Sequence, residues 1–303
     1  MNRILITGGS GLLGINFALK CRDKYEIILA LNERQISISK VLATNIALGS
    51  VIELKKSIEQ YKPDIIIHTA GLTSVEQCEQ YPNLAERVNV DLAENVAIAA
   101  KECKIKMVHI STDHLYSDGK FLYTEEDDKN PINVYGKTKS IAEQRVLSVS
   151  EDNLVIRTNF YGWGPSYRKS FSDAIIESLS KNKKIVLFDD VHYTPILVDS
   201  LINCVLDLCN LNQKGIFNVV TSSSISKYDF GLMIASKFKF DESLILKGSL
   251  KNNPQLVKRP LNMSLSNKKL ELTLGRSLNT VNEDIDQLYE QYLNGLNNEI
   301  NSI

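Results

Sequence analysis

The sequence lacks long apolar runs and any excess of charge of one sign. Its 35 Lys and Arg residues offset 36 Asp and Glu residues, so the chain creates no overall field that would attract nucleic acid. No run of about 18 apolar residues is present. Met1-Asn2-Arg3 leads directly into an apolar segment without the features of a signal peptide. We therefore expect a cytoplasmic protein with neither a nucleic-acid nor a membrane partner, and we leave a homodimer open.

Cysteine is also scarce, with five residues scattered along the chain. The closest pair, Cys204 and Cys209, has no nearby His, so no metal-binding spacing is present. The odd number and the scatter argue against a disulfide framework. We expect reduced thiols in the protein core and no bound metal.

The first half of the chain alternates between short apolar runs rich in Ile and Val and longer segments with helical periodicity. This alternation predicts an α/β fold with a doubly wound parallel sheet of the Rossmann type, in which helices cover both faces. The expected strands are 3–7, 26–31, 64–70, 107–111 and 154–158, and the expected helices are 12–21, 51–61, 84–103 and 135–149.

Beyond residue 158 this rhythm loosens, beginning with the loop sequence NFYGWGPSYRKS. A helix to about residue 179, a strand near 185–188 and later segments at 216–220, 227–238, 244–247 and 281–293 predict a smaller mixed α/β lobe. The predicted division places 1–160 in a dinucleotide-binding lobe, to which 196–222 return. Residues 161–195 and 223–303 then form the substrate-binding lobe.

The segment ITGGSGLLG carries three glycines at intervals of three, after one apolar run and before a helical stretch. At such a turn the N-terminus of the helix offers free N–H donors and a positive dipole end to a pyrophosphate. Glycine lets the backbone approach the phosphate closely. We interpret the turn as a dinucleotide site, the alternative being a simple packing turn. Its residues are Gly8, Ser10, Gly11, Leu12, Leu13 and Gly14.

The residues at the end of the second strand should contact the adenosine ribose of the cofactor. An acidic residue there binds the 2′-hydroxyl of NAD, whereas a cation accommodates the 2′-phosphate of NADP. This strand is followed by neutral Asn32 and, two residues later, by Arg34. The pattern favours NADP over NAD, while Glu33 keeps NAD open.

Tyr135 and Lys139 are four residues apart in a helix-compatible stretch, so both side chains should share one helix face. An ammonium close to a phenol lowers the phenol pKa and prepares it for proton transfer. A second pair with the same spacing, Tyr116 and Lys120, spans the turn sequence Asp118-Gly119 and need not share a face. We therefore assign the chemistry to Tyr135 and Lys139.

The segment VHISTDHLYSD runs from an apolar strand into a loop, at the sheet edge where open α/β sheets bind ligands. Thr112 is expected near the Tyr/Lys pair, where it could bind a substrate carbonyl. Asp113 and His114 follow at the mouth of the same site, although an exposed loop histidine is an equal alternative for His114. His68 and His109 lie within strands and are expected to be core residues.

Taken together, these motifs resemble the extended short-chain dehydrogenase/reductase family. Within it, the chain resembles the dTDP-4-dehydrorhamnose reductase branch, which reduces the 4-keto group of nucleotide-activated deoxysugars. The resemblance covers nearly the whole chain and is strongest from 62 to 158. The supporting segments are the glycine turn, KPDIIIHTAGLTSVEQCEQYP, VNV, VHISTDHLYSD, YTEEDDKNPINVYGKTKSIAEQ and KRPLNMSL.

By position, the resemblance implies that Thr112, Tyr135 and Lys139 are the catalytic residues. The implied cofactor-binding residues are those of the glycine turn, Asn32, Arg34, Ala70, Gly71, Asn89, Tyr135 and Lys139. The implied substrate-binding residues are Thr73, Val75, Asp113, His114, Asn159, Phe160 and Arg259, with Arg168 as a second phosphate-binding candidate.

The chain departs from the family pattern at several positions. Related sugar-nucleotide 4,6-dehydratases carry Thr-Asp-Glu where this chain has Thr-Asp-His at 112–114, so the usual elimination base is absent. The reductase branch usually has an aromatic residue in place of His114. Ala47 matches a position that usually carries an Asp beside the adenine, and the segment RTNFYGWG is one residue shorter than usual.

The resemblance implies an NADPH-dependent reductase of a nucleotide-diphospho-4-keto-6-deoxysugar, acting in deoxysugar or surface polysaccharide biosynthesis. Two alternatives stay open. One is a nucleotide-sugar 4-epimerase with bound NAD, which Glu33 would favour. The other is a non-catalytic NADP-binding regulatory subunit, since such a subunit of methionine adenosyltransferase shares the fold. The intact Tyr135/Lys139 pair weighs against this second alternative.

Overall fold

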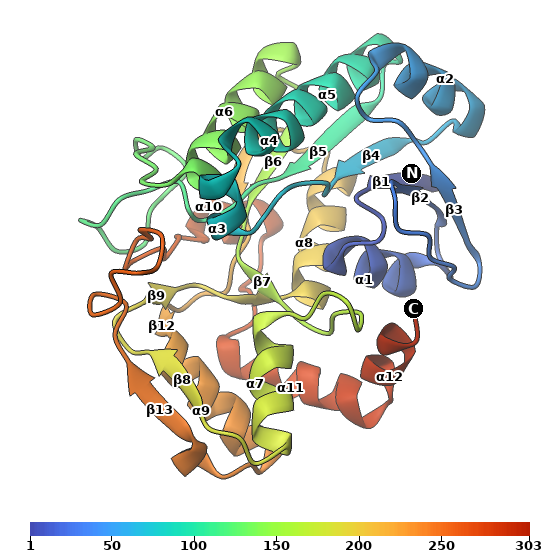
Figure 1. The fold of residues 1–303 in the computed structure, drawn as a ribbon. Coiled ribbons are helices and arrows are strands. Elements are labelled where there is room, and N and C mark those ends of the chain that lie inside the picture. The colour runs from blue at the N-terminus through green and yellow to red at the C-terminus, as the bar shows by residue number, and fades with distance from the viewer.

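A seven-stranded parallel sheet forms the centre of the computed structural model, which describes residues 1–303 (Figure 1). Its strand order is β11-β6-β5-β4-β1-β2-β3, and every neighbouring pair is parallel. The predicted doubly wound fold is confirmed. The strands are β1 (Arg3–Thr7), β2 (Glu26–Leu31), β3 (Val41–Asn45), β4 (Ile65–His68), β5 (Lys106–Ile110), β6 (Leu154–Arg157) and β11 (Gly215–Asn218).

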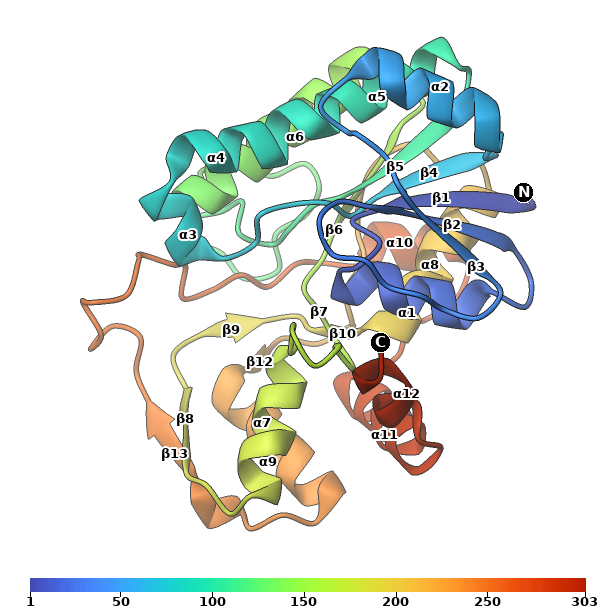
Figure 2. The ribbon, with the colours of Figure 1, turned by 45° about the vertical axis from the view of Figure 1, so that its right-hand side comes forward.

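Helices cover both faces of this sheet because successive apolar side chains along each strand point to opposite sides. One face carries Leu5, Ile28 and Ile66 and packs against α2 (Val51–Tyr61), α5 (Leu92–Glu102) and α6 (Val134–Val149). The opposite face carries Ile4, Ile6 and other strand residues and packs against α1 (Leu12–Cys21) and α8 (Val198–Asn210). Figure 2 shows the sheet between these two helical layers.

Two parts of the first half differ from the predicted segments. Strand β3 was not predicted, because it lies at the sheet edge and only part of its surface is buried, which weakens the apolar pattern. The single helix expected at 84–103 is instead α4 (Pro82–Glu86), a π-helical turn η1 (Arg87–Asp91) and α5. A short helix, α3 (Val75–Gln80), precedes them. Single π turns are frequent at functional sites, and this one contains Asn89.

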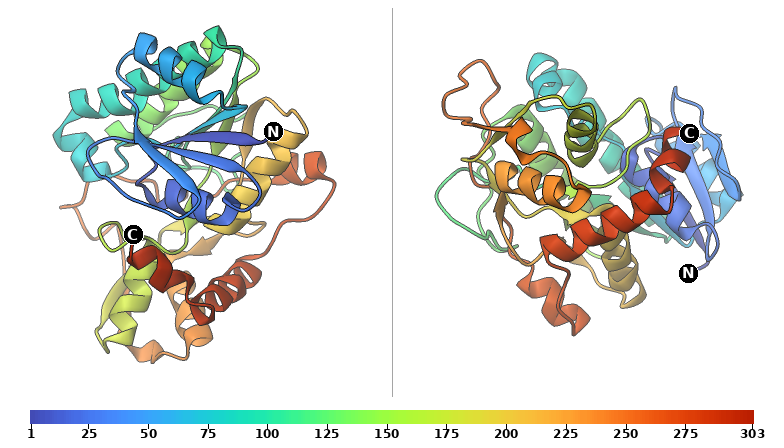
Figure 3. Two further views of the ribbon diagram at one scale, coloured as in Figure 1. Left: turned by 90° about the vertical axis from the view of Figure 1, so that its right-hand side faces the viewer. Right: turned by 90° about the horizontal axis from the view of Figure 1, so that it is seen from below.

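Other segments of the second half of the chain form a smaller lobe of helices and two-stranded sheets, which lies below the large sheet in the left view of Figure 3. Aromatic side chains, among them Trp163, Phe230 and Phe238, fill its interior. Its paired strands are β7 (Phe160–Tyr161) with β10 (Ile196–Leu197), β8 (Ile185–Phe188) with β13 (Ile245–Gly248), and β9 (His192–Tyr193) with β12 (Ile225–Ser226). Its helices are α7 (Phe171–Ser180), α9 (Lys227–Phe238), η2 (Glu242–Leu244), α11 (Val281–Leu293) and α12 (Leu296–Asn301), while α10 (Lys268–Leu274) packs beside β11.

None of these helices is both long and apolar enough to cross a membrane. All five cysteines carry free thiols, four of them buried. Burial raises the pKa of the Cys21, Cys78 and Cys204 thiols to about 11, which keeps them protonated and unreactive near neutral pH.

Candidate active site

The glycine turn connects β1 to α1 and has a backbone that only glycine accommodates. Gly8 has a φ of +67°, and a Cβ there would lie 2.7 Å from the backbone nitrogen of Ala70. A Cβ on Gly14 would lie 2.8 Å from the carbonyl oxygen of Gly8, so this glycine lets α1 pack onto the turn. Helix α1 begins after Gly11, which supplies no side-chain cap. The first amides of α1 are therefore available to an anion, as a pyrophosphate site requires.

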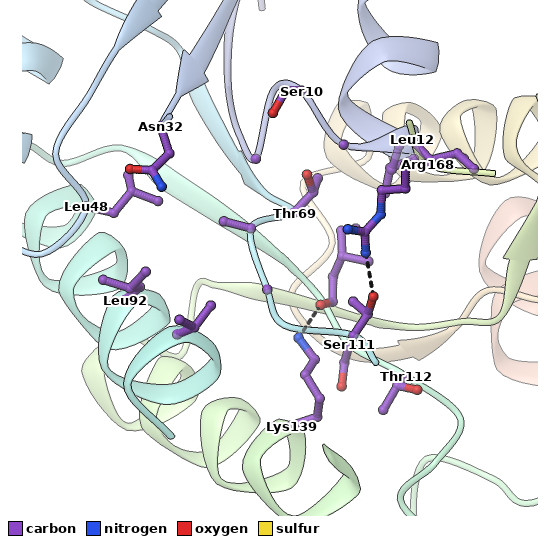
Figure 4. A pocket seen from close by; sticks show the side chains of 18 of the residues that line it. Ser10, Leu12, Asn32, Leu48, Thr69, Leu92, Ser111, Thr112, Lys139 and Arg168 are labelled. Atoms are coloured by element: carbon purple, nitrogen blue, oxygen red, sulfur yellow. Dashed lines mark hydrogen bonds between the residues drawn. The ribbon is translucent and has the colours of Figure 1, made fainter. Parts of the chain in front are cut away.

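A cavity of about 1290 Å³ runs from this turn along the carboxyl ends of the strands (Figure 4). Asn32 and Ser10 lie towards one end of it, and Thr112 and Lys139 lie towards the other. The cavity therefore brings together sequence-predicted residues that are far apart along the chain. Those that line it are Gly8, Ser10, Gly11, Leu12, Leu13, Asn32, Arg34, Ala70, Gly71, Thr73, Val75, Thr112, Asp113, His114, Tyr135, Lys139, Asn159, Phe160 and Arg168.

Three predicted site residues, Gly14, Asn89 and Arg259, do not line this cavity. The amide side chain of Asn89 accepts a hydrogen bond from Leu72 N at 2.7 Å and donates to Leu72 O and to Thr138 Oγ1, both at 3.0 Å. Asn89 therefore ties the loop after β4 to α6 and has no donor left for a ligand. Arg259 forms an ion pair with Glu76 and lines a second cavity, described below.

At the adenosine end, Arg34 stacks on the ring of Tyr167, with the guanidinium carbon 3.7 Å from the ring centroid. The Tyr167 hydroxyl also donates to the Ser10 carbonyl oxygen at 2.9 Å. Asn32, Glu33 and Arg34 are all exposed, but only Asn32 and Arg34 line the cavity. The segment after β2 therefore presents a cation and an amide to a ligand, and its carboxylate, Glu33, lies outside the lining.

Tyr135 and Lys139 lie on the first two turns of α6, which Asn133 caps by accepting from Gly136 N at 2.8 Å. Lys139 Nζ donates to the Ile110 carbonyl oxygen at 2.7 Å and to His109 Nε2 at 3.1 Å. Burial lowers the pKa of Lys139 to about 8, and the negative charge of Glu143 opposes that shift. The amine is therefore mostly charged at neutral pH, and it loses its proton as the pH rises through about 8.

Burial has the opposite effect on the Tyr135 phenol, whose pKa it raises well above the ordinary value. A hydrogen bond with Thr112 and the charge of Arg168 oppose this shift, whereas Lys139 does not contribute. The sequence-based expectation of a lowered phenol pKa is therefore wrong for the free protein, because the effect of burial outweighs the groups that lower the pKa. A neutral phenol is a proton donor, which is the role that carbonyl reduction needs.

Asp113, Asn159 and His114 form the wall next to Tyr135. Asn159 Nδ2 donates to Asp113 Oδ2 at 2.6 Å, and Thr112 Oγ1 donates to Asp113 Oδ1 at 3.3 Å. Burial raises the pKa of Asp113 to about 6 despite these hydrogen bonds. His114 packs edge-on against Tyr135, with ring centroids 5.4 Å apart, and burial lowers its pKa to about 3. His114 is thus a neutral wall residue and not an exposed loop histidine.

A second cavity of about 220 Å³ shares His114 with the first and extends into the smaller lobe. Its walls are largely apolar, with Phe171, Leu187 and Met263 among them, and its two cations are Lys227 and Arg259. The Lys227 ammonium lies 4.4 Å from the Phe171 ring centroid and 4.7 Å from that of Tyr193. Burial lowers the pKa of Lys227 to about 8, and the charge of Asp113 opposes that shift. An apolar cavity with such a cation suits a ligand that has a flat ring and an anionic group.

The model of the family described as RmlD substrate binding domain matches residues 1–294 of this chain. The chain belongs to this family. A dTDP-4-dehydrorhamnose reductase of Aggregatibacter actinomycetemcomitans is 31% identical over 91% of this chain and 94% of its own length. The spore coat polysaccharide biosynthesis protein SpsK of Bacillus subtilis is 26% identical over 89% of this chain and 91% of its own. The resemblance drawn from the sequence motifs is therefore confirmed.

Solved structures of the RmlD family show the same fold. The crystal structure of a Bacillus anthracis dTDP-4-dehydrorhamnose reductase in complex with NADP has a TM-score of 0.85 and 24% sequence identity. The match covers 96% of this chain and 100% of that chain.

In this RmlD-family protein the second Tyr/Lys pair does not form a site. The Tyr116 hydroxyl donates to the Thr124 carbonyl oxygen at 3.0 Å and accepts from Arg157 Nη1 at 2.6 Å, whereas Lys120 pairs with Asp127 at 2.6 Å. The two side chains therefore have different partners on either side of the bend at Asp118-Gly119. Tyr116 instead supports Arg157, which is one of the largest fully buried side chains.

Sequence reasoning missed several residues of the site. Tyr167 and Lys227 lie in segments without a recognised motif, and only the fold brings them to the cavities. Arg157 of β6 and Glu143 of α6 form a fully buried ion pair at 2.9 Å. An Arg inside an apolar strand and a Glu four residues after Lys139 are the only sequence signals of this pair. Further cavity residues that were not predicted are Ala30, Leu31, Ile46, Leu48, Gly49, Thr69, Arg87, Val88, Asp91, Leu92, Asn95, Ile110, Ser111, Thr158 and Lys169.

Proposed function

We propose that this protein is an NADPH-dependent reductase of a nucleotide-diphospho-4-keto-6-deoxysugar, acting in deoxysugar and surface polysaccharide biosynthesis. The observation that carries the proposal is one continuous cavity with the glycine turn at one end and Thr112, Tyr135 and Lys139 at the other. Membership of the RmlD family and the names of the relatives, which are reductases and a polysaccharide biosynthesis protein, support it.

The residues of the cofactor wall fit NADP. The free amides at the start of α1 would hold the pyrophosphate, and Asn32 and Arg34 would hold the 2′-phosphate. Ala70, Gly71 and Lys139 would hold the second ribose and its ring. When bound, NADPH supplies the hydride for reduction of a carbonyl carbon.

Residues of the chain itself would protonate and bind the oxygen of that carbonyl. Tyr135, neutral because of its burial, would donate a proton to the oxygen as negative charge develops on it. Thr112 would donate its hydroxyl proton to the same oxygen instead of to Asp113, and Asp113 and Asn159, which hydrogen-bond to each other, would hold the sugar in place. Thr73, Val75, His114 and Phe160 would complete the sugar site.

The nucleotide half of the substrate would occupy the second cavity. Its apolar wall would receive the base, and Lys227, Arg259 and Arg168 would bind the diphosphate. We also keep the division into two lobes as a proposal: 1–160 with 196–222 for the cofactor, and 161–195 with 223–303 for the substrate. The pairing of β11 with β6 in the large sheet supports the return of 196–222 to the first lobe.

Two observations weigh against the alternatives. An epimerase with bound NAD would need an acid at the ribose, and Glu33 is exposed outside the cavity wall. A non-catalytic subunit would have no need of the buried Tyr135 and Lys139, which both line the cavity. We further propose that the protein acts in the cytoplasm, where its free thiols stay reduced, and that it can form a homodimer.

A direct test measures oxidation of NADPH by its absorbance in the presence of a panel of nucleotide-diphospho-4-keto-6-deoxysugars. We expect turnover of at least one of them, and no formation of a 4-keto product from dTDP-glucose and NAD. Turnover of dTDP-glucose would instead make the protein a dehydratase. NADPH binding without turnover of any sugar would favour the regulatory subunit.

A further inference from the structure

Three polar side chains form a buried row across neighbouring strands beneath the cofactor wall. Thr7 of β1 is in register with His68 of β4, and His68 is in register with His109 of β5, so all three side chains lie on the same face of the sheet. Each is at most 1% exposed. The Thr7 hydroxyl is 2.8 Å from His68 Nδ1, and the two imidazole rings stack with centroids 5.5 Å apart. The row ends at Lys139, which donates to His109 Nε2 at 3.1 Å.

The neighbours of this row determine which ring nitrogens carry protons. Ala70 N donates to Thr7 Oγ1 at 3.4 Å, which leaves the hydroxyl proton of Thr7 free for His68 Nδ1. An ammonium has no lone pair, so His109 Nε2 must be the acceptor from Lys139 and the proton of this ring must lie on Nδ1. Burial and the charge of Lys139 lower the pKa of both histidines, that of His68 to about 3, so both rings are neutral.

This arrangement defines how the Lys139 ammonium is oriented. Of its three N–H donors, one goes to the Ile110 carbonyl oxygen and one to His109, which leaves a single donor for the cavity. The charged groups around it are few. Glu143 lies one turn along α6, but Arg157, Lys129 and the Ser111 hydroxyl already bind its carboxylate. His109 is therefore the only side chain that hydrogen-bonds to Lys139.

We infer that His109 is a positioning residue of the proposed reductase: its neutral imidazole accepts a hydrogen bond from Lys139, directs one ammonium donor into the cavity and stabilises the charged form of the lysine. This inference rests on the proposed function in one respect, because the proposed function assigns Lys139 to the cofactor ribose. His68 stacks on His109 and makes no hydrogen bond to Lys139. The sequence places both histidines in the core and distinguishes neither from the other.

The inference has a definite consequence for pH dependence. A hydrogen bond that stabilises the charged form of a basic group raises its pKa, so loss of the acceptor should lower the pKa of Lys139. The lysine must be charged to bind a ribose oxygen as a donor with full strength. NADPH affinity should therefore persist below the pKa of Lys139 and decline as the pH rises through it, near pH 8 in the unchanged protein.

The experiment compares three variants by fluorescence titration of NADPH between pH 6 and pH 10. His109→Phe removes the acceptor at similar volume, and we expect the decline in affinity to move down by about one pH unit, which is tenfold in the proton affinity of the lysine. His109→Gln keeps an acceptor and should restore the decline to its original pH. His68→Phe is the matched control, because it makes the same substitution on the neighbouring strand. It should leave the pH at which NADPH affinity declines unchanged.

An equal shift in His68→Phe and His109→Phe, or no shift in His109→Phe, would overturn the inference in favour of a purely structural pair. If His109→Phe does not fold, His109→Met offers a flexible apolar side chain for the same comparison. The alkaline limb of kcat with a keto-sugar provides a second readout. NADPH titration needs no sugar, so failure of the proposed function would leave this test intact.

Discussion

The two cavities together present a cofactor wall and a substrate wall, and these two walls differ in the groups that form them. The cofactor wall is mostly backbone: the glycine turn, the start of α1 and the loop after β4 present main-chain groups, and glycines at 8 and 14 allow their close contacts. The substrate wall is made of side chains that come from distant parts of the chain, such as Asp113, Asn159 and Lys227. The first wall can be shared by many dinucleotide-binding proteins, whereas the second would determine, under the proposed function, which substrate fits.

The largest expected effect comes from Tyr135, where the two walls meet. Tyr135→Phe removes the transferable proton but keeps the ring, so kcat should fall by roughly a hundredfold or more. NADPH affinity should stay within a few-fold, because the cofactor wall is otherwise unchanged. Steady-state kinetics and fluorescence titration measure both quantities.

Tyr116→Phe is the matched control, since this tyrosine has the same spacing to a lysine but contacts Arg157. Its rate should stay within a few-fold of the unchanged protein once folding has been verified by circular dichroism. A Tyr135→Phe enzyme that retains most of its activity would remove Tyr135 from the mechanism.

Lys227 tests the substrate wall alone. Lys227→Met keeps the apolar length of the side chain and removes the cation, so KM for the nucleotide sugar should rise by about tenfold or more. NADPH affinity should not change, because Lys227 lines the second cavity and not the cofactor wall.

Lys247→Met provides the comparison for this variant. Lys247 also lies over an aromatic ring, 4.8 Å from the centroid of Tyr228, but it is exposed and outside both cavities. Its substitution should leave KM unchanged. An equal rise of KM in both variants would mean that net charge, and not the second cavity, affects substrate binding.

The difference between the walls also explains which site residues could be predicted from the sequence and which could not. The glycine turn and the Tyr135/Lys139 pair are local, because each depends on a few residues within one turn and the helix that follows. Lys227 and Tyr167 reach the cavities only through the packing of the smaller lobe, which no short spacing encodes. The edge strand β3 was missed for a related reason, since its partial burial leaves no continuous apolar run.

The histidines mark a subtler limit. Strand periodicity correctly placed His68 and His109 in the core, but the contact of one of them with Lys139 depends on strand register and on the approach of α6. The pKa of Tyr135 was also beyond the reach of the sequence, and here the expectation had the wrong direction. The spacing suggested a lowered pKa, and burial, which spacing does not report, raises it.

Arg34 tests the one position of the cofactor wall where a side chain, and not the backbone, should determine the preference for NADPH over NADH. Arg34→Ala should weaken NADPH binding by about tenfold through loss of a charge-assisted contact with the 2′-phosphate. NADH has no such phosphate, so its affinity should stay nearly constant. Titration of both cofactors measures the ratio. Tighter binding of NADH than of NADPH in the unchanged protein would restore NAD, and with it the epimerase, as the better assignment.

The smallest expected effect concerns Tyr167, which belongs to the second half of the chain yet supports the cofactor wall. Its ring holds the Arg34 guanidinium at 3.7 Å, and its hydroxyl donates to the Ser10 carbonyl oxygen in the glycine turn. An exposed cation–π contact contributes about 0.5–1 kcal/mol, so Tyr167→Leu should weaken NADPH binding two- to fivefold. Tyr167→Phe keeps the ring and should lose less, which separates the stacking from the hydrogen bond. In the Arg34→Ala background, Tyr167→Leu should have little further effect on NADPH, because the ring then has no guanidinium to orient. Fully additive losses would show instead that Tyr167 acts on the turn through Ser10. The cofactor wall would then depend on the smaller lobe for its backbone as well as for its charge.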